Sequence, residues 1–355
     1  MIKNSEKILI IGHKGYVGHV LIKYLKQYSL YRNSLFGVDY NLFTLNDYYK
    51  NKKLLKDEIN LDCRKFKISN LKFKPNVIVY LAAVSNDPMG SNYKYATEEI
   101  NYKYCIKLAK EAKKLKIAKF IFASSCSMYG SASNSKRKES DKLYPLTDYA
   151  KSKVNSEKNL KTIASKEFKV ISMRFATAAG LSTNLRLDLV FNDFIASSVL
   201  TKKIELLSSG NSWRPLIHVR DMSRAIKWAI EYKSKKNFLP INIGSDKWNF
   251  KIIKLAEKIS KIVKGAKIIV KDKKNVDKRS YKVNFNLFKK LAPRHQPNTN
   301  FRASVIELKN FLFKEKKNLK NFRNSPKWSR LSMLNYLVKN KKIDKKLLLI
   351  KKHDR

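Results

Sequence analysis

The sequence predicts an α/β protein built on a doubly wound parallel sheet, with a smaller C-terminal lobe. Strand-like apolar runs alternate with helical patterns through residues 1–180, as in right-handed βαβ crossovers. The chain has 355 residues, 43% of them hydrophobic, which suffices for one large core and a smaller lobe. The first strand-like run also ends in glycines that open a helical pattern, as a dinucleotide-binding unit does.

The first element is an apolar strand at residues 7–11, which breaks into glycines. Apolar residues then recur at helical spacing up to Leu25. A strand, a glycine-rich turn and a helix N-terminus form an anion site, because backbone N–H groups point at phosphates and missing side chains let a pyrophosphate approach. A Rossmann-type cofactor site is therefore expected at Gly12, Gly15, Tyr16, Val17 and Gly18.

The next strand-like run, residues 34–40, selects the cofactor. It ends near Asp39, whose carboxylate could accept hydrogen bonds from the ribose hydroxyls of an adenosine. A carboxylate at this position would repel a 2′-phosphate. The expected cofactor is therefore NAD rather than NADP.

The segment at residues 120–130 and the residues after it predict the chemistry. Ser125 ends an apolar strand-like run, and Tyr149 and Lys153 follow one helical turn apart, on the same helix face. An ammonium beside a phenol stabilises the phenolate and lowers a pKa that is ordinarily about 10. These three residues can take a proton from a sugar alcohol while a hydride leaves the same carbon, so they are the catalytic candidates.

The glycine spacing, three and three, together with Ser125 and the Tyr149/Lys153 pair resembles the extended short-chain dehydrogenases/reductases. Within them it is most similar to the NAD-dependent nucleotide-sugar epimerases and dehydratases, and further matches follow in family order over roughly residues 5–310. Residues 60–64 and the strand at residues 77–83 resemble family segments that lie along the cofactor. The resemblance implies cofactor contacts from Asp62, Cys63, Leu81, Ala82, Ala83, Asn101, Tyr149 and Lys153.

The resemblance also extends to the substrate side. Residues 174–180 resemble the family segment that turns toward the substrate, and residues 212–221 resemble the segment whose arginine holds a sugar-nucleotide diphosphate. Thr177 departs from the asparagine usual in the sugar 4-epimerases, and the loop at residues 84–90 could equally be an ordinary proline-containing loop. The implied substrate contacts are Ser85, Asn86, Ser127, Thr177, Asn192, Arg214 and Arg279.

The family pattern assigns each catalytic candidate a role. Tyr149 takes the proton from a sugar hydroxyl at C4, Ser125 hydrogen-bonds the same oxygen, and Lys153 lowers the tyrosine pKa and binds the nicotinamide ribose. Dehydratases of the family place an Asp-Glu pair directly after the serine, whereas this chain has Cys126 and Ser127 there. The acidic cysteine of the 3,5-epimerases aligns with Ser127, so Cys126 is expected to be a buried strand-end residue.

The resemblance therefore favours a nucleotide-sugar 4-epimerase that acts through a transient 4-keto sugar, of the UDP-glucose/galactose type. A nucleotide-sugar 4-dehydrogenase or keto-sugar reductase uses the same three residues and stays open. A UDP-sugar is the favoured substrate, although the sequence does not identify the nucleotide. The family often forms homodimers, so a homodimer is expected, one interface helix being the one that holds Tyr149.

The net charge of +49 raises a non-enzymatic alternative, a basic NAD-binding protein that associates with nucleic acid. Residues 309–355 contain 16 Lys and Arg against three acids, but the rest of the excess is spread along the chain. Codon bias explains an even spread better than nucleic-acid recognition, which concentrates charge and aromatic side chains on one element. No specific nucleic-acid partner is expected, and the basic field should attract nucleotide sugars.

Composition argues against a membrane protein and a metalloprotein. No apolar run reaches the about 18 residues needed to span a bilayer, and the N-terminus lacks the layout of a signal peptide. Cys63, Cys105 and Cys126 cannot all pair and lack metal-site spacing, and the five histidines are scattered. A reduced, cytoplasmic, metal-free protein is expected, without a membrane partner.

Three regions are expected along the chain. Residues 1–180 form the NAD-binding domain, residues 181–310 form mainly the substrate-binding lobe with a partial return to the Rossmann sheet, and residues 311–355 form a basic helical extension. Two apolar helical stripes near the C-terminus are expected to pack against the body or a second subunit, and no chemical role is assigned to them. They are Val305, Ile306, Leu308, Phe311 and Leu312, then Trp328, Leu331, Leu334 and Leu337.

Overall fold

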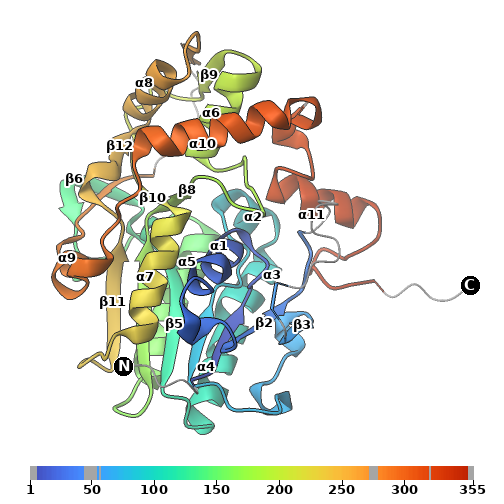
Figure 1. Cartoon of the computed structure of the whole chain (residues 1–355), viewed down its shortest axis with the longest axis vertical. Helices are drawn as coiled ribbons and strands as arrows, with labels where there is room; N and C mark the ends of the chain where they lie inside the picture. Colours follow the sequence, from blue (N-terminus) through green and yellow to red (C-terminus); the bar gives the residue numbers. More distant parts are fainter. Residues whose placement is uncertain (1–5, 44–53, 56, 272–278, 320, 351–355) are drawn as a thin grey trace, which may run out of the picture.

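The computed structural model describes residues 6–43, 54–55, 57–271, 279–319 and 321–350 (Figure 1). Its centre is a seven-stranded sheet in the order β11-β7-β5-β4-β1-β2-β3, and every pairing in it is parallel. This confirms the predicted doubly wound α/β fold. The strands are β1 (Ile8–Ile11), β2 (Leu35–Asp39), β3 (Asp57–Asn60), β4 (Val77–Tyr80), β5 (Lys119–Ser125), β7 (Lys169–Phe175) and β11 (Phe238–Ile243).

The central strands are apolar throughout because helices cover both faces of the sheet. Along β1, Ile8 and Ile10 pack under helices α1 (Tyr16–Leu25) and α7 (Val219–Glu231). The alternate residues Leu9 and Ile11 pack on the other face, under α4 (Cys105–Lys114) and α5 (Asp148–Ile163). A π-helical turn, Glu98–Tyr104, leads into α4 on that face. Because β1 pairs with both β2 and β4, the chain reverses its winding direction at this point, which is where open α/β sheets bind ligands.

The second lobe lies beyond the carboxyl ends of the strands (Figure 1). It contains a separate apolar core under α6, α8 and α10. The chain returns from this lobe to the main sheet through β11. The lobe and its connections comprise α6 (Val190–Leu200), α8 (Ile252–Ile262), α9 (Asn286–Leu291), α10 (Phe301–Lys314), the paired strands β9 (Lys203–Leu206) and β13 (Lys267–Val270), β6 (Ser131–Arg137) and β14 (Ser280–Val283), and the three-stranded sheet of β8 (Thr177–Ala179), β10 (Trp213–His218) and β12 (Asn249–Lys251).

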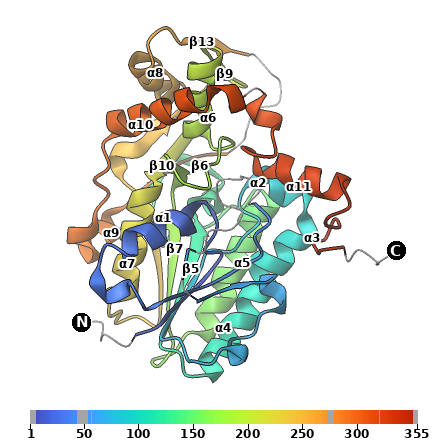
Figure 2. The same ribbon diagram turned by 45° about the vertical axis from the view of Figure 1, so that its right-hand side comes forward.

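The C-terminal stripes pack against the body of the protein. Val305, Leu308 and Leu312 of α10 are buried in the lobe core, whereas Ile306 is 37% exposed. The last helix, α11 (Arg330–Lys339), lies beside α2 (Asp87–Asn92) and α3 (Lys94–Thr97), as Figures 1 and 2 show. The extension is therefore divided between two places, one in the lobe and one on the Rossmann half. In the described part of the chain, no helix is both long and apolar enough to cross a membrane.

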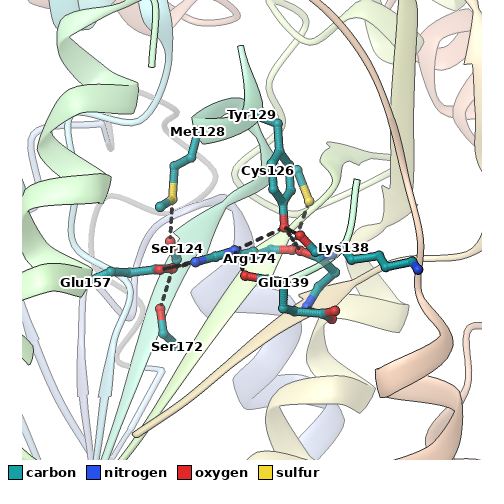
Figure 3. Close-up of polar contacts among 10 residues, drawn as sticks. Ser124, Cys126, Met128, Tyr129, Lys138, Glu139, Glu157, Ser172 and Arg174 are labelled. Carbon is teal, nitrogen blue, oxygen red and sulfur yellow. Dashed lines mark hydrogen bonds and ion pairs between the residues drawn. The ribbon is translucent and has the colours of Figure 1, made fainter. Parts of the chain in front are cut away.

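A buried ion pair joins β7 to α5 behind the carboxyl end of β5 (Figure 3). Arg174 binds both carboxylate oxygens of Glu157, at 2.7–3.1 Å, and Ser172 donates to the same carboxylate at 2.8 Å. Arg174 also donates to the Tyr129 hydroxyl at 3.1 Å, and its carbonyl accepts from the Cys126 thiol at 3.1 Å. The network thus fixes the turn that follows Ser125.

Replacing Glu157 by glutamine should lower the free energy of unfolding by about 3–5 kcal/mol, because Arg174 would stay buried without a counter-charge. Urea unfolding measures the change. The matched control is Glu257→Gln, whose partner Lys254 is exposed, and it should cost less than about 0.5 kcal/mol. Equal losses in the two variants would show that the buried pair has no special weight in stability.

Candidate active site

A cavity of about 870 Å³ lies at the carboxyl edge of the sheet, between the Rossmann half and the lobe. Its walls come from both halves of the chain and include nearly all the site residues predicted from the sequence. The predicted residues that line it are Gly12, Gly15, Tyr16, Val17, Gly18, Asp39, Asp62, Cys63, Leu81, Ala82, Ala83, Ser85, Asn86, Ser125, Ser127, Tyr149, Lys153, Thr177, Arg214 and Arg279.

The glycine turn is shaped for close approach. Gly12 has a φ of +87°, and a Cβ there would lie 2.6 Å from the backbone nitrogen of Ala82. A Cβ on Gly18 would lie 2.3 Å from the carbonyl oxygen of His13, so α1 can rest on the turn only without that side chain. Gly15 is the N-cap of α1 and has no side chain to occupy the helix end. The N-terminus of α1 is thus free to receive a diphosphate, as NAD binding requires.

Asp39 lies beside this turn, at the end of β2. Its carboxylate accepts the backbone N–H groups of Lys14 and Asn41, both at 2.8 Å. These two bonds fix the carboxylate where the cavity wall meets the glycine turn. An acid held at this place fits the ribose of NAD and disfavours the 2′-phosphate of NADP.

Asp62, which resembles the family's adenine contact, is 3% exposed and is paired with Arg64. The Arg64 guanidinium donates to both carboxylate oxygens at 2.6–3.0 Å. It also donates to the carbonyls of Lys346 and Leu347, at 2.7 and 2.9 Å. The expected adenine contact is therefore linked to the C-terminal segment of the chain.

The catalytic candidates lie together. Tyr149 and Lys153 project from the first turns of α5, and the Ser125 hydroxyl at the end of β5 is hydrogen-bonded to Tyr149. Lys153 is 2% exposed, donates to the carbonyl of Ala123 at 2.7 Å, and has its ammonium 5.6 Å from the centroid of the Tyr149 ring. Gly90 permits this arrangement, since a Cβ there would lie 3.0 Å from that of Tyr149.

The titration of these groups is set by burial. Burial raises the pKa of Tyr149, while the hydrogen bond from Ser125 and the positive charge of Arg186 lower it in part. The charge of Arg186 is a contribution that the spacing of Tyr149 and Lys153 does not reveal, and the role of Lys153 in lowering the tyrosine pKa stays a prediction. Burial also lowers the pKa of Lys153 to about 8. The ammonium is therefore poorly stabilised where it lies.

Arg186 was missed by the sequence analysis. It is buried, lines the cavity, and donates to the Ser85 hydroxyl at 2.8 Å. It forms a two-point ion pair with Asp188, at 2.8 and 3.0 Å, and Asn86 donates to the same carboxylate at 2.8 Å. The Ser85–Asn86 loop is thus connected to the Arg186/Asp188 pair beside Tyr149. The only feature of the sequence that could have indicated this ion pair is an arginine and an aspartate two residues apart between leucines.

The substrate side of the cavity contains further arginines. Arg214 donates to the carbonyl of Trp213 at 2.9 Å and to that of Arg279. Arg279 forms an ion pair with Asp87, and Asp87 also accepts from the hydroxyl of Thr147, the N-cap of α5, at 2.5 Å. These contacts hold two cations at the wall where the family pattern expects a diphosphate.

Two predicted contact residues do not line the cavity. Asn101 accepts from the N–H of Val84 at 2.8 Å and donates to its carbonyl at 3.1 Å, so it positions the loop after β4. Asn192 accepts from the N–H of Gly180 and donates to the carbonyl of Arg186, both at 2.8 Å. Both side chains are fully buried behind the wall and shape it through the backbone.

Cys126 is 1% exposed, does not line the cavity, and has a pKa raised by burial, as expected of a buried strand-end residue.

The C-terminal segment, to which the sequence assigns no chemical role, supplies part of the cavity wall. Its lining residues are Arg323, Ser329, Arg330, Leu331, Leu334 and Leu347.

Comparisons with known proteins agree with this geometry. An ADP-L-glycero-D-manno-heptose-6-epimerase of Brachyspira hyodysenteriae is 23% identical over 276 residues, which cover 74% of this chain and 82% of the relative. The UDP-N-acetylglucosamine 4-epimerase from Methanobrevibacter ruminantium M1, solved with UDP-N-acetylmuramic acid, superposes with a TM-score of 0.76 at 21% identity. It matches over 88% of this chain and 99% of its own.

A dehydratase is also structurally similar. The dTDP-glucose 4,6-dehydratase from Streptomyces venezuelae, solved with NAD bound, has a TM-score of 0.74 at 16% identity, over 88% of this chain and 98% of its own. At such identities the likeness shows the fold alone. The family itself is shown by the sequence, because the model of the NAD dependent epimerase/dehydratase family matches residues 8–244, from β1 through β11. With a glycine turn, Asp39 and a Ser125/Tyr149/Lys153 site within that span, the chain belongs to the NAD-dependent epimerase/dehydratase family.

Proposed function

We propose that this protein is a nucleotide-sugar 4-epimerase that acts on a UDP-sugar through a transient 4-keto sugar. One observation supports it most. The cavity brings Ser125, Tyr149 and Lys153 together beside the glycine turn, while the two positions after Ser125 hold Cys126 and Ser127. The oxidation machinery is complete, and the carboxylates that would eliminate water are missing from the place where the dehydratases of the family have them.

The proposed reaction needs only groups already present. Tyr149, as its phenolate, takes the proton of the C4 hydroxyl, and Ser125 holds that oxygen through a hydrogen bond. Lys153 lies under the tyrosine ring, and in the proposed reaction it would bind the nicotinamide ribose. NAD, held by the glycine turn and Asp39, would supply the hydride chemistry at C4. Tyr149 then reprotonates the C4 oxygen after the keto sugar has turned its other face, so no further acid or base is required.

The carboxylates nearest the Ser85–Asn86 loop are poorly suited to act as acids. Burial alone would raise the pKa of Asp188, but the charge and hydrogen bonds of Arg186, together with the charge of Arg330, lower it below its ordinary value, so Asp188 is ionised. Asp87 is held in an ion pair with Arg279. A dehydratase needs a proton donor for the leaving hydroxyl. These pairs therefore favour epimerisation over elimination.

A panel of nucleotide sugars tests the proposal. The purified protein is incubated with UDP-glucose, UDP-galactose, UDP-N-acetylglucosamine and UDP-glucuronic acid, and the products are identified by NMR while the absorbance of reduced nicotinamide is followed. A C4-inverted sugar without net NADH is the expected result. Stoichiometric NADH with a keto sugar would make the protein a 4-dehydrogenase. RNA binding that weakens steeply with salt, without turnover of any sugar, would favour the nucleic-acid alternative.

The homodimer stays a prediction, and the surface suggests a condition for it. The exposed stripe of α5, the helix expected at the interface, contains Lys151, Lys158 and Lys161. Pairing this stripe with its own copy would bring like charges together, so dimerisation should strengthen as salt screens them. Light scattering at low and high ionic strength measures this, and a monomer under both conditions would contradict it.

A further inference from the structure

Arg330, the first residue of α11, lines the same cavity as the glycine turn although it is 5% exposed. Its guanidinium donates to the carbonyls of Phe43 and Asn184, at 3.3 and 3.1 Å, and to the side-chain oxygen of Asn184. It also lies 4.5 Å from the centroid of the Phe43 ring. All of these partners are uncharged. Among the residues that the structure describes, no carboxylate lies within ion-pair distance of Arg330.

A buried guanidinium without a carboxylate is energetically unfavourable, because neutral acceptors replace only part of its hydration. Burial, reinforced by the nearby charge of Arg186, lowers the pKa of Arg330 to about 9, although the charges of Asp188 and Asp39 oppose this shift. The surrounding carboxylates therefore compensate this charge only in part, and an anion in the cavity would stabilise it further.

The position of Arg330 indicates which anion. Its partner Asn184 donates to the carbonyl of Lys14 at 2.8 Å, within the glycine turn. Its other partner, Phe43, lies four residues beyond Asp39, the expected ribose contact. Arg330 thus stands beside the helix N-terminus where a dinucleotide places its doubly charged diphosphate.

We infer that Arg330 is a cofactor-binding residue that binds the diphosphate of NAD, and that residues 328–349, called here the C-terminal clamp, enclose the adenosine half of the cofactor. This goes beyond the proposed function and does not depend on it, since it requires only the NAD site of the family. Neither the matched family segment, which ends at residue 244, nor the sequence pattern points to this region.

The C-terminal clamp is attached on several sides of the cavity. The N–H of Leu187 donates to the carbonyl of Trp328 at 2.9 Å, and the hydroxyl of Tyr93 donates to the side chain of Asn335 at 2.8 Å. Near the end of the clamp, Arg64 donates to the backbone carbonyls of Lys346 and Leu347, and the N–H of Leu349 donates to the hydroxyl of Tyr40 at 2.8 Å. Met333, Leu334 and Leu337 fill the space over α2 and α3.

These attachments imply slow release of the cofactor. The adenosine half would have to leave past the clamp, and Arg64 ties the clamp to Asp62, the expected adenine contact. Slow release suits a reaction in which the cofactor is oxidised again before each product leaves.

Binding of defined ligands to an Arg330→Gln variant tests the assignment. Loss of a charge-assisted contact should lower the affinity for NADH and for ADP-ribose, which both contain the diphosphate, by about 10- to 100-fold. Adenosine, which lacks it, should bind within about twofold of the wild type. Arg330→Lys should retain part of the affinity, and Arg302→Gln, at an exposed arginine of α10, is the matched control. Calorimetry gives the affinities, and NADH fluorescence after dilution gives the release rate.

Two results would overturn the inference. Unchanged binding of NADH and ADP-ribose with weakened UDP would assign Arg330 to the substrate nucleotide. An equal loss of affinity for adenosine and for ADP-ribose would show that Arg330 has only a structural role.

A second measurement uses the wild-type protein and so does not depend on how the variant folds. Hydrogen exchange followed by mass spectrometry is compared in the absence of ligand, with adenosine and with ADP-ribose. Exchange in residues 328–349 should slow with ADP-ribose more than with adenosine. Exchange in this segment that is the same under all three conditions would contradict the clamp.

Discussion

Replacing Tyr149 by phenylalanine is expected to lower turnover of the UDP-sugar by about 100- to 10,000-fold, the usual weight of a general acid–base group. The variant lacks the one oxygen that can receive the C4 proton and return it. The cofactor should stay bound, since the glycine turn and Asp39 are untouched. The effect should therefore fall on kcat, with the NAD content of the protein unchanged.

Two assays separate these effects. Product formation is followed by NMR at saturating substrate, and bound NAD is quantified by absorbance after the protein is denatured. Tyr144→Phe serves as the matched control, because Tyr144 is 44% exposed and does not line the cavity, and it should keep full activity. Turnover of Tyr149→Phe at the wild-type rate would remove Tyr149 from the mechanism.

Replacing Lys153 by methionine should have opposite effects on function and stability. Turnover and NAD binding should both fall, because the ammonium lies against the Tyr149 ring and is proposed to bind the nicotinamide ribose. The cofactor-free protein should become more stable at pH 7, by about 2 kcal/mol. This sum combines about 3 kcal/mol from the depressed pKa with the loss of about 1 kcal/mol from the bond to Ala123.

The pH dependence follows from the same shift. Burial lowers the pKa of Lys153 to about 8 from an ordinary value of 10.5, so the unfolded chain binds more protons between these limits. The contribution of Lys153 to the stability of the wild type therefore rises with pH across this window, and its burial penalty is full below it. The advantage of Lys153→Met should shrink as the pH increases from 7 to 9.5.

Urea unfolding of the cofactor-free proteins at both pH values measures this advantage. Lys119, whose pKa burial also lowers to about 8, is present in wild type and variant alike and cancels in the comparison. Lys151→Met, at an exposed position of the same helix, should change stability by less than about 0.5 kcal/mol. A Lys153→Met protein that is less stable than the wild type at pH 7 would show that the buried ammonium is well accommodated.

The parts of this site that the sequence predicts are those set by local spacing. The glycine turn, Asp39 at the end of β2, and Ser125 with the Tyr149/Lys153 pair depend on strand ends and on one helical turn, which a pattern of residues reveals. The resemblance implies that Asn101 contacts the cofactor and Asn192 the substrate, but the side chains of both bind backbone groups behind the wall. Which way an asparagine points depends on packing, which spacing does not specify.

The parts that the sequence did not predict arise from contacts between distant segments. The charge of Arg186 affects the pKa of Tyr149 only because the loop before α6 lies beside the first turn of α5. Arg330 binds Asn184, 146 positions earlier in the sequence, and Asn184 in turn binds the carbonyl of Lys14 in the glycine turn. In a chain with 77 Lys and Arg, neither arginine differs from its neighbours until the fold buries it.

The most direct test of the 4-epimerase assignment is a UDP-sugar deuterated at C4, incubated with a catalytic amount of protein and followed by NMR. We expect a C4-inverted product that retains deuterium at C4, with no net NADH, because the hydride leaves and returns within one closed site. Product deoxygenated at C6, or a keto sugar accumulating with one equivalent of deuterated NADH, would contradict it.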